Sequence, residues 1–464
     1  MNKKQLNHYL LLLSILGCSM FMSSCDDDDN NSNPDESIVV LTQGNDDLST
    51  LEAALVKFPD LVSALSASGQ LTVFAPTNAA FENLLDAVGQ SSLDDIPDEV
   101  LRDILEYHVV QGAKPSNELT NGEVTTLGGE KITVSTSGGV TLNGSASVVT
   151  ADVRASNGVI HVVDEVLVPP TMAPVIGTIV APAYFNKNFT TLIAAVKAAS
   201  PTVLSTLLAS DNKTLFAPTN DAFAAAGITT LPNQATLDAV LKYHVISTRV
   251  PSSQIATGSS SAETLNGKIY LSKGDNGVYI NGSSKVTTAD VSASNGVVHV
   301  IDRTLIPPSE TIAQIATRLS SATPAQFTQL VAALARTQGQ GGNDLLAAAS
   351  SSSSNLTVFA PTDAAFQSLY TALGVSGIDE IPLATLIAVL KHHIVPGRVF
   401  STDLSSGTVA TLNGNVTVNL SANPPTVSGS SGGDNIADLQ LAGLNIHATN
   451  GVIHVIDRVL LPQQ

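Results

Sequence analysis

The chain is poor in charge, in aromatic rings and above all in basic side chains. Only 13% of its 464 residues are charged, 4% are aromatic, and tryptophan is absent. The 21 Lys and Arg residues stand against 40 Asp and Glu residues, which gives a net charge of −19. These few Lys and Arg side chains cannot neutralise a phosphate backbone, which excludes nucleic acid as a partner. For the same reason we do not expect the chain to bind anionic lipid headgroups. The shortage of aromatic rings also leaves few exposed platforms of the kind on which glycans usually stack.

Cysteine is almost absent, and both cysteines lie within the first 25 residues. The chain starts with Lys3 and Lys4 and continues with an apolar stretch over residues 9–22, which is typical of an export signal and short for a membrane span. Cys25 follows two serines and precedes four aspartates. This arrangement resembles the lipobox of bacterial lipoproteins, where a signal peptidase cuts before a cysteine that then carries lipid. Cleavage at Cys18 and an ordinary secretory signal are the alternatives.

We therefore expect residues 1–24 to be a signal peptide and Cys25 to be lipidated, which leaves no second thiol for a disulfide in the mature chain. Residues 25–36 are interpreted as an acidic tether, since residues 26–47 hold eight acidic groups and no basic one. An acidic run at this place resembles the surface-export signal of some Gram-negative lipoproteins. It predicts attachment to the outer face of the outer membrane through the lipid, with periplasmic or secreted placement as alternatives.

Three sequence boxes recur in the same order three times along the chain. The first box, LTVFAPTNAAF in its first copy, lies at residues 71–81, 213–223 and 356–366. The second, LRDILEYHVV, lies at residues 101–110, 237–246 and 386–395. The third, SNGVIHVVDEVLVPP, lies at residues 156–170, 294–308 and 449–462. Successive copies of the first box are 142 and 143 residues apart, so each copy has the length of one domain.

Each box has a local physical interpretation. In the first box Phe74 belongs to a β-prone run, Pro76 ends the run and Thr77 is a good N-cap, so a strand turns into a helix. In the second box apolar residues recur at i, i+3, i+4 and i+7, a helical stripe that places His108 on the buried face. Gly-Gly and Asn-Gly pairs in the second half of each copy indicate hairpins. Helices followed by a small β meander predict an α+β domain.

These boxes resemble the signature of the fasciclin domain family, FAPTN-x-AF near the start and NGVIHVID near the end with a Leu-rich YH segment between them. The resemblance covers nearly all of residues 37–464. It implies that each copy is a small antiparallel β-sandwich or wedge flanked by helices, and it implies secreted or surface-anchored proteins that mediate adhesion or matrix contact. A few members bind apolar pigments. We expect domains at residues 37–171, 172–309 and 310–464, joined by short Pro-containing linkers that restrict hinging.

Catalytic patterns are missing from the sequence. It contains no GxSxG elbow, HExxH, Walker A or CxxC pattern. Six of the nine histidines lie inside the repeated boxes, which favours hydrogen-bonded core histidines over catalytic ones. Asp164, Asp302 and Asp457 end the last strand of each copy and are interpreted as turn or cap residues. The chain is therefore predicted to be non-enzymatic and to need no cofactor.

The third copy departs from the other two. It has His392 in place of a tyrosine, Asn445 in place of an aspartate, and extra Ser, Gly and Asn residues over 421–445. It also gains His447, where the earlier copies have Arg154 and Ser292. A zinc or copper site is the hypothesis that these changes raise, because imidazole suits both metals. Core positions inherited from a repeat do not supply open ligands, so we expect no metal at the four histidines of this copy, His392, His393, His447 and His454.

The resemblance also implies a candidate interaction site. In animal members of the family the YH segment is proposed to contact integrins, and carried over it falls on Tyr107, His108, Tyr243, His244, His392 and His393. The buried position of the histidine opposes this transfer, and a bacterial lipoprotein has no integrin partner unless it meets a host. Substitution of the tyrosines separates the two interpretations, because a core residue affects stability and a contact residue affects binding.

The leading hypothesis is thus a surface lipoprotein that binds a protein or glycan partner through three adhesive modules. Weak sites repeated three times gain avidity when they face one surface. The alternative is a binding protein for an apolar small molecule or a glycan, of which the apolar ligand suits this Ala- and Val-rich chain better.

Overall fold

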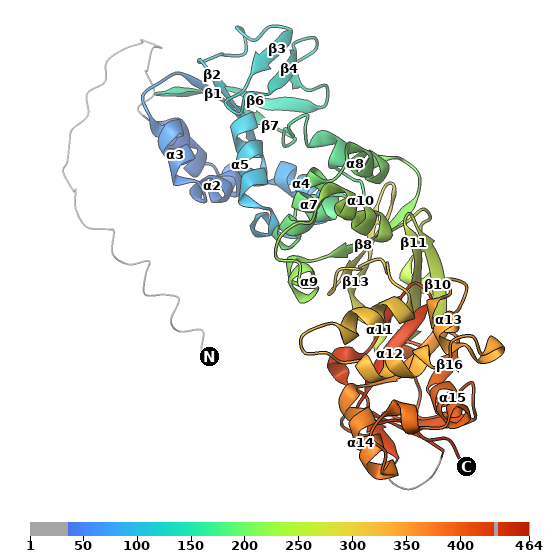
Figure 1. Ribbon diagram of the computed structural model, residues 1–464. Helices are drawn as coiled ribbons and strands as arrows, with labels where there is room; N and C mark the ends of the chain where they lie inside the picture. The colour runs from blue at the N-terminus through green and yellow to red at the C-terminus, as the bar shows by residue number, and fades with distance from the viewer. Residues whose placement is uncertain (1–35, 431–434, 464) are drawn as a thin grey trace, which may run out of the picture.

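Three domains of like architecture follow one another in a row (Figure 1). The computed structural model describes residues 36–430 and 435–463. Domain 1, blue to cyan, lies at one end of the row, and domain 3, orange to red, lies at the other. Cys25, the predicted signal peptide and all of the predicted tether except Glu36 lie outside the described residues.

The helices and strands have the following bounds. Domain 1 contains α1 (Ile38–Gln43), α2 (Ser49–Val56), α3 (Pro59–Ser66), β1 (Leu71–Pro76), α4 (Asn78–Val88), α5 (Asp98–Tyr107), β2 (Val109–Gln111), β3 (Gly122–Thr125), β4 (Lys131–Ser135), β5 (Thr141–Leu142), β6 (Ala146–Ala155) and β7 (Gly158–Val163). Domain 2 contains α6 (Ala181–Tyr184), α7 (Thr190–Ala198), α8 (Pro201–Leu208), β8 (Lys213–Pro218), α9 (Asn220–Ala225), α10 (Gln234–Tyr243), β9 (Val245–Ile246), β10 (Gly258–Thr264), β11 (Gly267–Gly274), β12 (Gly277–Ile280), β13 (Ser284–Ala293) and β14 (Gly296–Ile301). Domain 3 contains α11 (Ile312–Ser320), α12 (Thr328–Ala335), α13 (Leu345–Ser350), β15 (Leu356–Pro361), α14 (Asp363–Leu373), α15 (Leu383–His392), β16 (Ile394–Pro396), β17 (Gly407–Ala410), β18 (Asn415–Asn419), β19 (Thr426–Ser428), β20 (Ile436–Asp438), β21 (Ile446–Ala448) and β22 (Gly451–Ile456).

The first box forms the strand-to-helix turn that its residues predict. The Thr77 hydroxyl accepts a hydrogen bond from the Ala80 N–H at 3.2 Å and caps α4, and Thr77 alone separates the end of β1 from the start of α4. Thr219 and Thr362 cap α9 and α14 in the same way. The helix of the second box follows in each domain, and its apolar stripe faces the core.

The α+β class is confirmed, but the sheets are not antiparallel throughout. In each domain the first-box strand pairs in parallel with the last-box strand: β1 with β7, β8 with β14 and β15 with β22. In domain 1 residues 77–157 lie between the two partners, so the parallel pair joins segments that are far apart in the sequence. The strands close into a barrel in domain 2 and form one seven-stranded sheet in domain 1.

The glycine of the third box permits this parallel pairing. A Cβ atom at Gly158 would lie 2.1 Å from the carbonyl oxygen of Leu71, and the same atom at Gly296 or Gly451 would lie 2.1 or 2.0 Å from the equivalent oxygen. Real Cβ atoms do not approach a carbonyl oxygen this closely, so the strands can pair here only without a side chain.

Domain 3 has a broken version of the long strand that precedes the last one. β6 and β13 are ten-residue strands with two register shifts each. In domain 3 this strand is divided into β20 and β21 by the short 3-10 helix Leu441–Gly443. The sheet splits accordingly into two four-stranded sheets. The extra residues that the sequence places over 421–445 therefore interrupt a strand.

The apolar core of each domain has a part beside the helices and a part inside the β structure. Separate clusters inside the β structure form around Phe74, Phe216 and Phe359. On the helical side, one cluster of buried residues runs through both domain 1 and domain 2, whereas domain 3 has a cluster of its own. Within the described ranges no single helix is both long and apolar enough to cross a membrane, and the pair Lys187–Ala198 and Pro201–Leu208 meets that test only when joined across a 120° bend.

Candidate functional site

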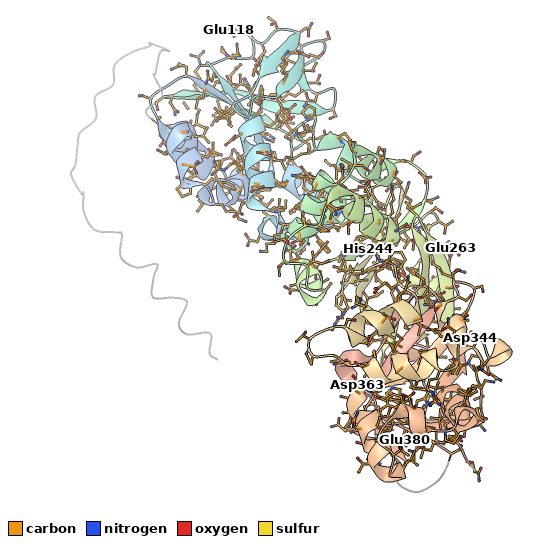
Figure 2. The ribbon with its side chains drawn as sticks, viewed as in Figure 1. Glu118, His244, Glu263, Asp344, Asp363 and Glu380 are labelled. Carbon is orange, nitrogen blue, oxygen red and sulfur yellow. The ribbon has the colours of Figure 1, made fainter. Side chains whose placement is uncertain are left out.

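The histidine of the YH segment lies inside each domain, as the apolar stripe predicts. His108 is 2% exposed, its Nδ1–H donates to the Ile104 carbonyl at 2.7 Å, and its Nε2 accepts the Leu167 N–H at 2.8 Å. His244 and His393 make the equivalent pairs of hydrogen bonds. Burial lowers the pKa of each of the three imidazoles from 6.5 to about 4, so they are neutral at pH 7. Figure 2 marks His244 within domain 2, whereas the exposed Glu118 and Glu263 lie at the periphery.

The tyrosine beside this histidine is also enclosed. Tyr107 is 1% exposed, and its hydroxyl donates to the Lys131 carbonyl at 2.7 Å and accepts from the Asn143 amide at 3.0 Å. Tyr243 makes the same two contacts in domain 2. The tyrosine hydroxyl thus holds the start of one strand to the hairpin turn at Asn143. Each bond joins residues at least 24 positions apart, so the tyrosine joins the helix to the sheet.

His392 takes over the position of the tyrosine in domain 3. Its Nδ1–H donates to the Asn413 carbonyl at 2.7 Å, and its side chain is buried. The six residues of the candidate interaction site are therefore all covered by the domains that contain them, and their polar atoms have internal partners.

The histidine of the third box has a second, equally repeated role. His161 stacks on Phe74 with ring centroids 5.6 Å apart, and its Nε2–H donates to the Lys114 carbonyl at 2.9 Å. His299 and His454 pair with Phe216 and Phe359 in the same way.

The asparagine of the third box fastens the beginning of each domain to its end. The Asn157 amide oxygen accepts the Ile38 N–H at 2.9 Å, and its NH₂ group donates to the carbonyls of Leu65 and Ala67. Asn295 and Asn450 make the same three contacts in domains 2 and 3. The aspartates that follow accept the backbone N–H of a residue 17 to 19 positions earlier in the neighbouring strand, at 2.6 to 2.7 Å, so these bonds join two strands and do not cap a local turn.

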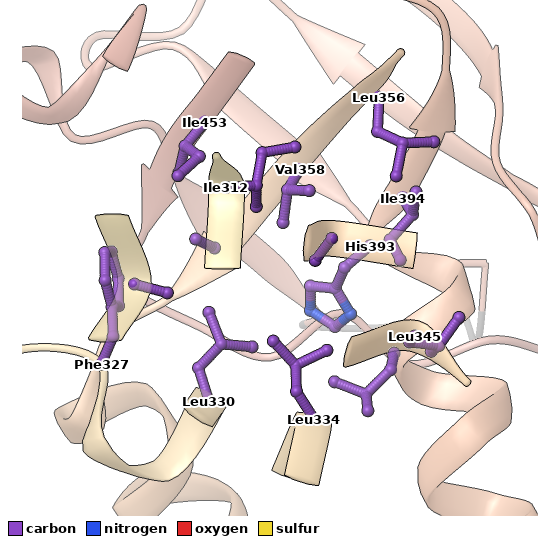
Figure 3. A pocket seen from close by; sticks show the side chains of 14 residues that line it. Ile312, Phe327, Leu330, Leu334, Leu345, Leu356, Val358, His393, Ile394 and Ile453 are labelled. Carbon is purple, nitrogen blue, oxygen red and sulfur yellow. The ribbon is translucent and has the colours of Figure 1, made fainter. Parts of the chain in front are cut away.

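The four histidines of domain 3 do not converge. His393 lies in the helical core, where Figure 3 shows it among Leu334, Leu345 and other apolar side chains. The cavity beside it measures about 20 Å³, which is room for one water molecule at most. His454 stacks on Phe359, and His447 lies at the contact with domain 2. Within residues 36–430 and 435–463, no group of three His, Cys, Asp or Glu side chains is close enough to hold a metal ion.

Three of the substitutions peculiar to domain 3, Phe400, Asn445 and His447, lie at its interface with domain 2. His447 and Phe400 pack against each other with centroids 5.5 Å apart, and both contact Tyr270 of domain 2 at 5.9 and 5.8 Å. The guanidinium of Arg398 lies over the Tyr270 ring, 4.6 Å from its centroid. Burial and the charge of Arg398 lower the pKa of His447 to about 3, so this imidazole is neutral in the interface. Phe400 occupies the position of Pro115 and Pro251, a departure that the sequence comparison missed.

The contacts of Asn445 show why domain 3 has an amide where the other copies have an aspartate. Asp290 has only acceptor oxygens, which receive the N–H and hydroxyl of Ser252. The amide oxygen of Asn445 still accepts the Ser401 N–H, and its NH₂ group also donates to the Gly282 carbonyl of domain 2 at 2.8 Å. The exchange of carboxylate for amide supplies the donor that joins the two domains.

Replacing Asn445 with aspartate is expected to loosen this interface without unfolding domain 3, because domain 2 folds with an aspartate at the same position. The carboxylate cannot donate to the Gly282 carbonyl and is repelled by it. We expect the contact between domains 2 and 3 to lose about 1–3 kcal/mol. Small-angle scattering should show a narrow distribution of shapes for the wild type and a broader one for Asn445→Asp. The circular dichroism spectrum serves as the control for folding, and identical scattering profiles would contradict the role given to Asn445.

An open apolar groove lies on domain 3, between the end of α14 and the first turns of α15. We call it the domain 3 groove. It encloses about 950 Å³, and most of its lining side chains are apolar, among them Phe366, Leu369, Leu373 and Leu461, with Thr385, Asn413 and Gln463 as polar members. The sequence gives one signal for it, since α15 is apolar on nearly every side, whereas α5 of domain 1 carries charges.

Comparison with known proteins agrees with the internal repeat. Residues 46–169, 187–307 and 325–462 each match the family described as the fasciclin domain. Protein sll1483 of Synechocystis is 48% identical over 134 residues, which cover 29% of this chain and 74% of that protein. Human periostin is 27% identical over 438 residues, covering 92% of this chain and 47% of periostin. Immunogenic protein MPB70 of Mycobacterium bovis is 39% identical over 142 residues, covering 29% of this chain and 70% of its own.

Among solved structures, a FAS1 domain pair from the insect cell adhesion molecule fasciclin I is 19% identical, and the match covers 59% of this chain and 97% of that one with a TM-score of 0.29. The chain spans about half the length of periostin.

Proposed function

The chain belongs to the fasciclin domain family, and from that premise we propose that it is a non-enzymatic surface lipoprotein that mediates adhesion or contact with an extracellular partner. In this proposal Cys25 carries the lipid, the acidic segment after it is the tether, and the three domains present the binding surface. The protein is attached to the outer membrane by lipid and exposed outside the cell.

The observation that carries the proposal is the internal use of the repeated polar side chains. The histidines, tyrosines, asparagines and aspartates of the three boxes bond to groups of their own domain. Catalysis needs a nucleophile or an acid and base that face a substrate. Side chains already committed to neighbours inside a core are poor candidates for that work, whereas an open apolar groove suits a binding partner.

The runner-up, a binding protein for an apolar small molecule, is favoured by one observation, the apolar lining of the domain 3 groove. The small cavity beside His393 does not help it, because about 20 Å³ admits no pigment or lipid. The groove is partly open to solvent, and small-molecule sites usually enclose most of their ligand. A protein surface therefore suits it better.

Palmitate labelling of the native host tests the anchor and the location together. Wild type and Cys25→Ala are grown with radiolabelled palmitate, and intact cells are treated with protease. We expect label in the wild type only, and loss of the wild-type protein from treated cells. Label retained in Cys25→Ala would reject Cys25 as the lipidated residue. Protection from protease would place the protein on the periplasmic side and favour a ligand carrier.

A further inference from the structure

The domain 3 groove has an internal reference, because the same face of domain 1 is covered. Residues 74–111 and 359–396 align without a gap. Val88 and Leu373 therefore occupy one position, the last residue of α4 and of α14, and each is followed by a left-handed glycine. Val88 is 0% exposed, whereas Leu373 is 52% exposed. A neighbouring segment therefore covers this face in domain 1, whereas the same face of domain 3 is exposed to solvent.

The segment that covers the face in domain 1 is the start of domain 2. The Gln90 side chain donates to the Pro182 carbonyl at 3.2 Å and accepts from the Asn186 amide at 2.9 Å. Five residues after Pro182, the Lys187 ammonium donates to the Asp94 carbonyl at 2.7 Å. Lys57 and, to a smaller extent, Lys187 hold the pKa of the Asp94 carboxyl below its usual value. The face thus receives a short apolar helix, α6, and a cation that follows it.

Domain 3 keeps the anion of this face and makes its floor more apolar. Asp379 stands at the position of Asp94, and its side chain is 94% exposed. It already lies 3.8 Å from the Arg336 guanidinium, just as the Asp94 carboxylate lies 2.6 Å from the Lys57 ammonium, so each anion has one cation of its own domain beside it. Two charged residues of α5, Glu99 and Asp103, are replaced in α15 by Ala384 and Ala388, and both alanines line the groove. A groove of this composition selects the same kind of segment, with a larger apolar contact and one positive charge.

We propose that the domain 3 groove binds the first helix of a fasciclin-type domain from another polypeptide, a short apolar helix with Lys or Arg five residues after its apolar anchor. This inference rests on the proposed interaction function and adds the surface and the chemistry of the partner.

A second copy of this chain is a poor occupant. Its first helix is α1, and the segment that begins there has Leu41 and Asp46 where domain 2 has Pro182 and Lys187. The alignment follows from the shared anchor, since Ile38 and Ile179 both donate their N–H to the third-box asparagine. Docking in the same geometry would bring Asp46 toward Asp379, and like charges oppose that contact. The partner therefore differs from this chain at the basic position.

Thiol reactivity at position 373 tests the proposal in a chain without residues 1–25, which retains every described residue and contains no cysteine. Leu373→Cys introduces one exposed thiol, and Val88→Cys places a matched thiol at the covered position of domain 1. The probe is this chain's own segment 172–190, appended after Gln464, so that it follows domain 3 in the register in which it follows domain 1. Modification by a thiol reagent is timed for each variant.

We expect the thiol of Val88→Cys to react slowly throughout, and the thiol of Leu373→Cys to react fast in the chain without the appended segment. The segment should slow the reaction of Leu373→Cys by about tenfold or more, since tethering gives it a high effective concentration. A segment carrying Lys187→Glu should leave the rate within about twofold of the chain without a segment.

An unchanged rate with the native segment would overturn the proposal. Protection that grows with protein concentration, without any segment, would assign the groove to a second copy and overturn the choice of occupant. Neither result depends on cells or lipid, so a failure here is distinct from a failure of the surface lipoprotein proposal.

Discussion

Acidification from pH 7 to pH 5 is expected to lower the free energy of unfolding of each domain by about 2 kcal/mol through the core histidine of its YH segment. Burial holds the pKa of His108, His244 and His393 at about 4 in the folded domains, below the ordinary value of 6.5. The unfolded chain therefore takes up a proton first as the pH falls. The contribution of the neutral, buried histidine to the stability of its domain is therefore complete above about pH 6.5, and it is lost as the pH falls toward about 4. Domain 3 should lose more than the other two, because burial also holds the pKa of His454 at about 4.

Urea denaturation at pH 7, 6 and 5 measures this loss, and the carboxylates whose pKa values are lowered stay ionised over that range. His244→Gln is the matched variant, because an amide can donate and accept but does not titrate here. Its domain should be less stable at pH 7 and nearly independent of pH between 7 and 5. A wild type with equal stability at pH 7 and pH 5 would contradict the neutral, buried state of these imidazoles.

Replacing Gly158 with alanine is expected to cost domain 1 more than about 3 kcal/mol, enough to remove most of its stability. The added methyl group would meet the Leu71 carbonyl oxygen at 2.1 Å and two further backbone atoms at 2.9 Å. Backbone atoms of paired strands cannot yield as a flexible side chain does, so the parallel pair of β1 and β7 must separate. Thermal unfolding followed by circular dichroism gives the loss.

Gly138→Ala controls for backbone conformation. Gly138 also has a positive φ, of 86°, but a Cβ atom there would meet nothing within 4 Å. The alanine should cost only about 1–2 kcal/mol, the strain of a left-handed residue with a side chain. Equal losses in the two variants would mean that the close approach of β1 and β7 does not determine the need for Gly158.

The helix caps, the helical stripes and the turns could be predicted because each is determined by residues that are close together in the sequence. The Thr77 cap, the helical stripe that ends at His108 and the Asn143-Gly144 turn each depend on a few adjacent residues, and the structure confirms all three. The role of Asn157 could not be predicted in this way. Its partner Ile38 lies 119 residues away, so only the folded domain brings them together. The parallel pairing of the first and last strands escaped prediction for the same reason.

The residues of domain 3 that differ from the repeat show a further limit. Asn445 and His447 stand out in the sequence as departures, but their role depends on Gly282 and Tyr270 of the preceding domain. Sequence reasoning grouped His447 with other histidines as a metal hypothesis, whereas the structure places it in an aromatic contact. Ala384 and Ala388, which replace charged residues of domain 1, are a signal of the groove in the sequence. Its exposure could not be predicted, because it depends on the absence of a neighbouring segment packed on this face.

The central claim, that the YH residues are structural and that binding belongs to other surfaces, is tested most directly by Tyr243→Phe. Removal of the hydroxyl leaves the Lys268 carbonyl and the Asn281 amide without their partner inside domain 2. We predict that urea denaturation shows a free energy of unfolding lower by about 1–3 kcal/mol. Cells that display the variant, at a temperature where it is folded, should adhere as well as cells that display the wild type. Unchanged stability with impaired adhesion would contradict the account and assign Tyr243 to the contact surface.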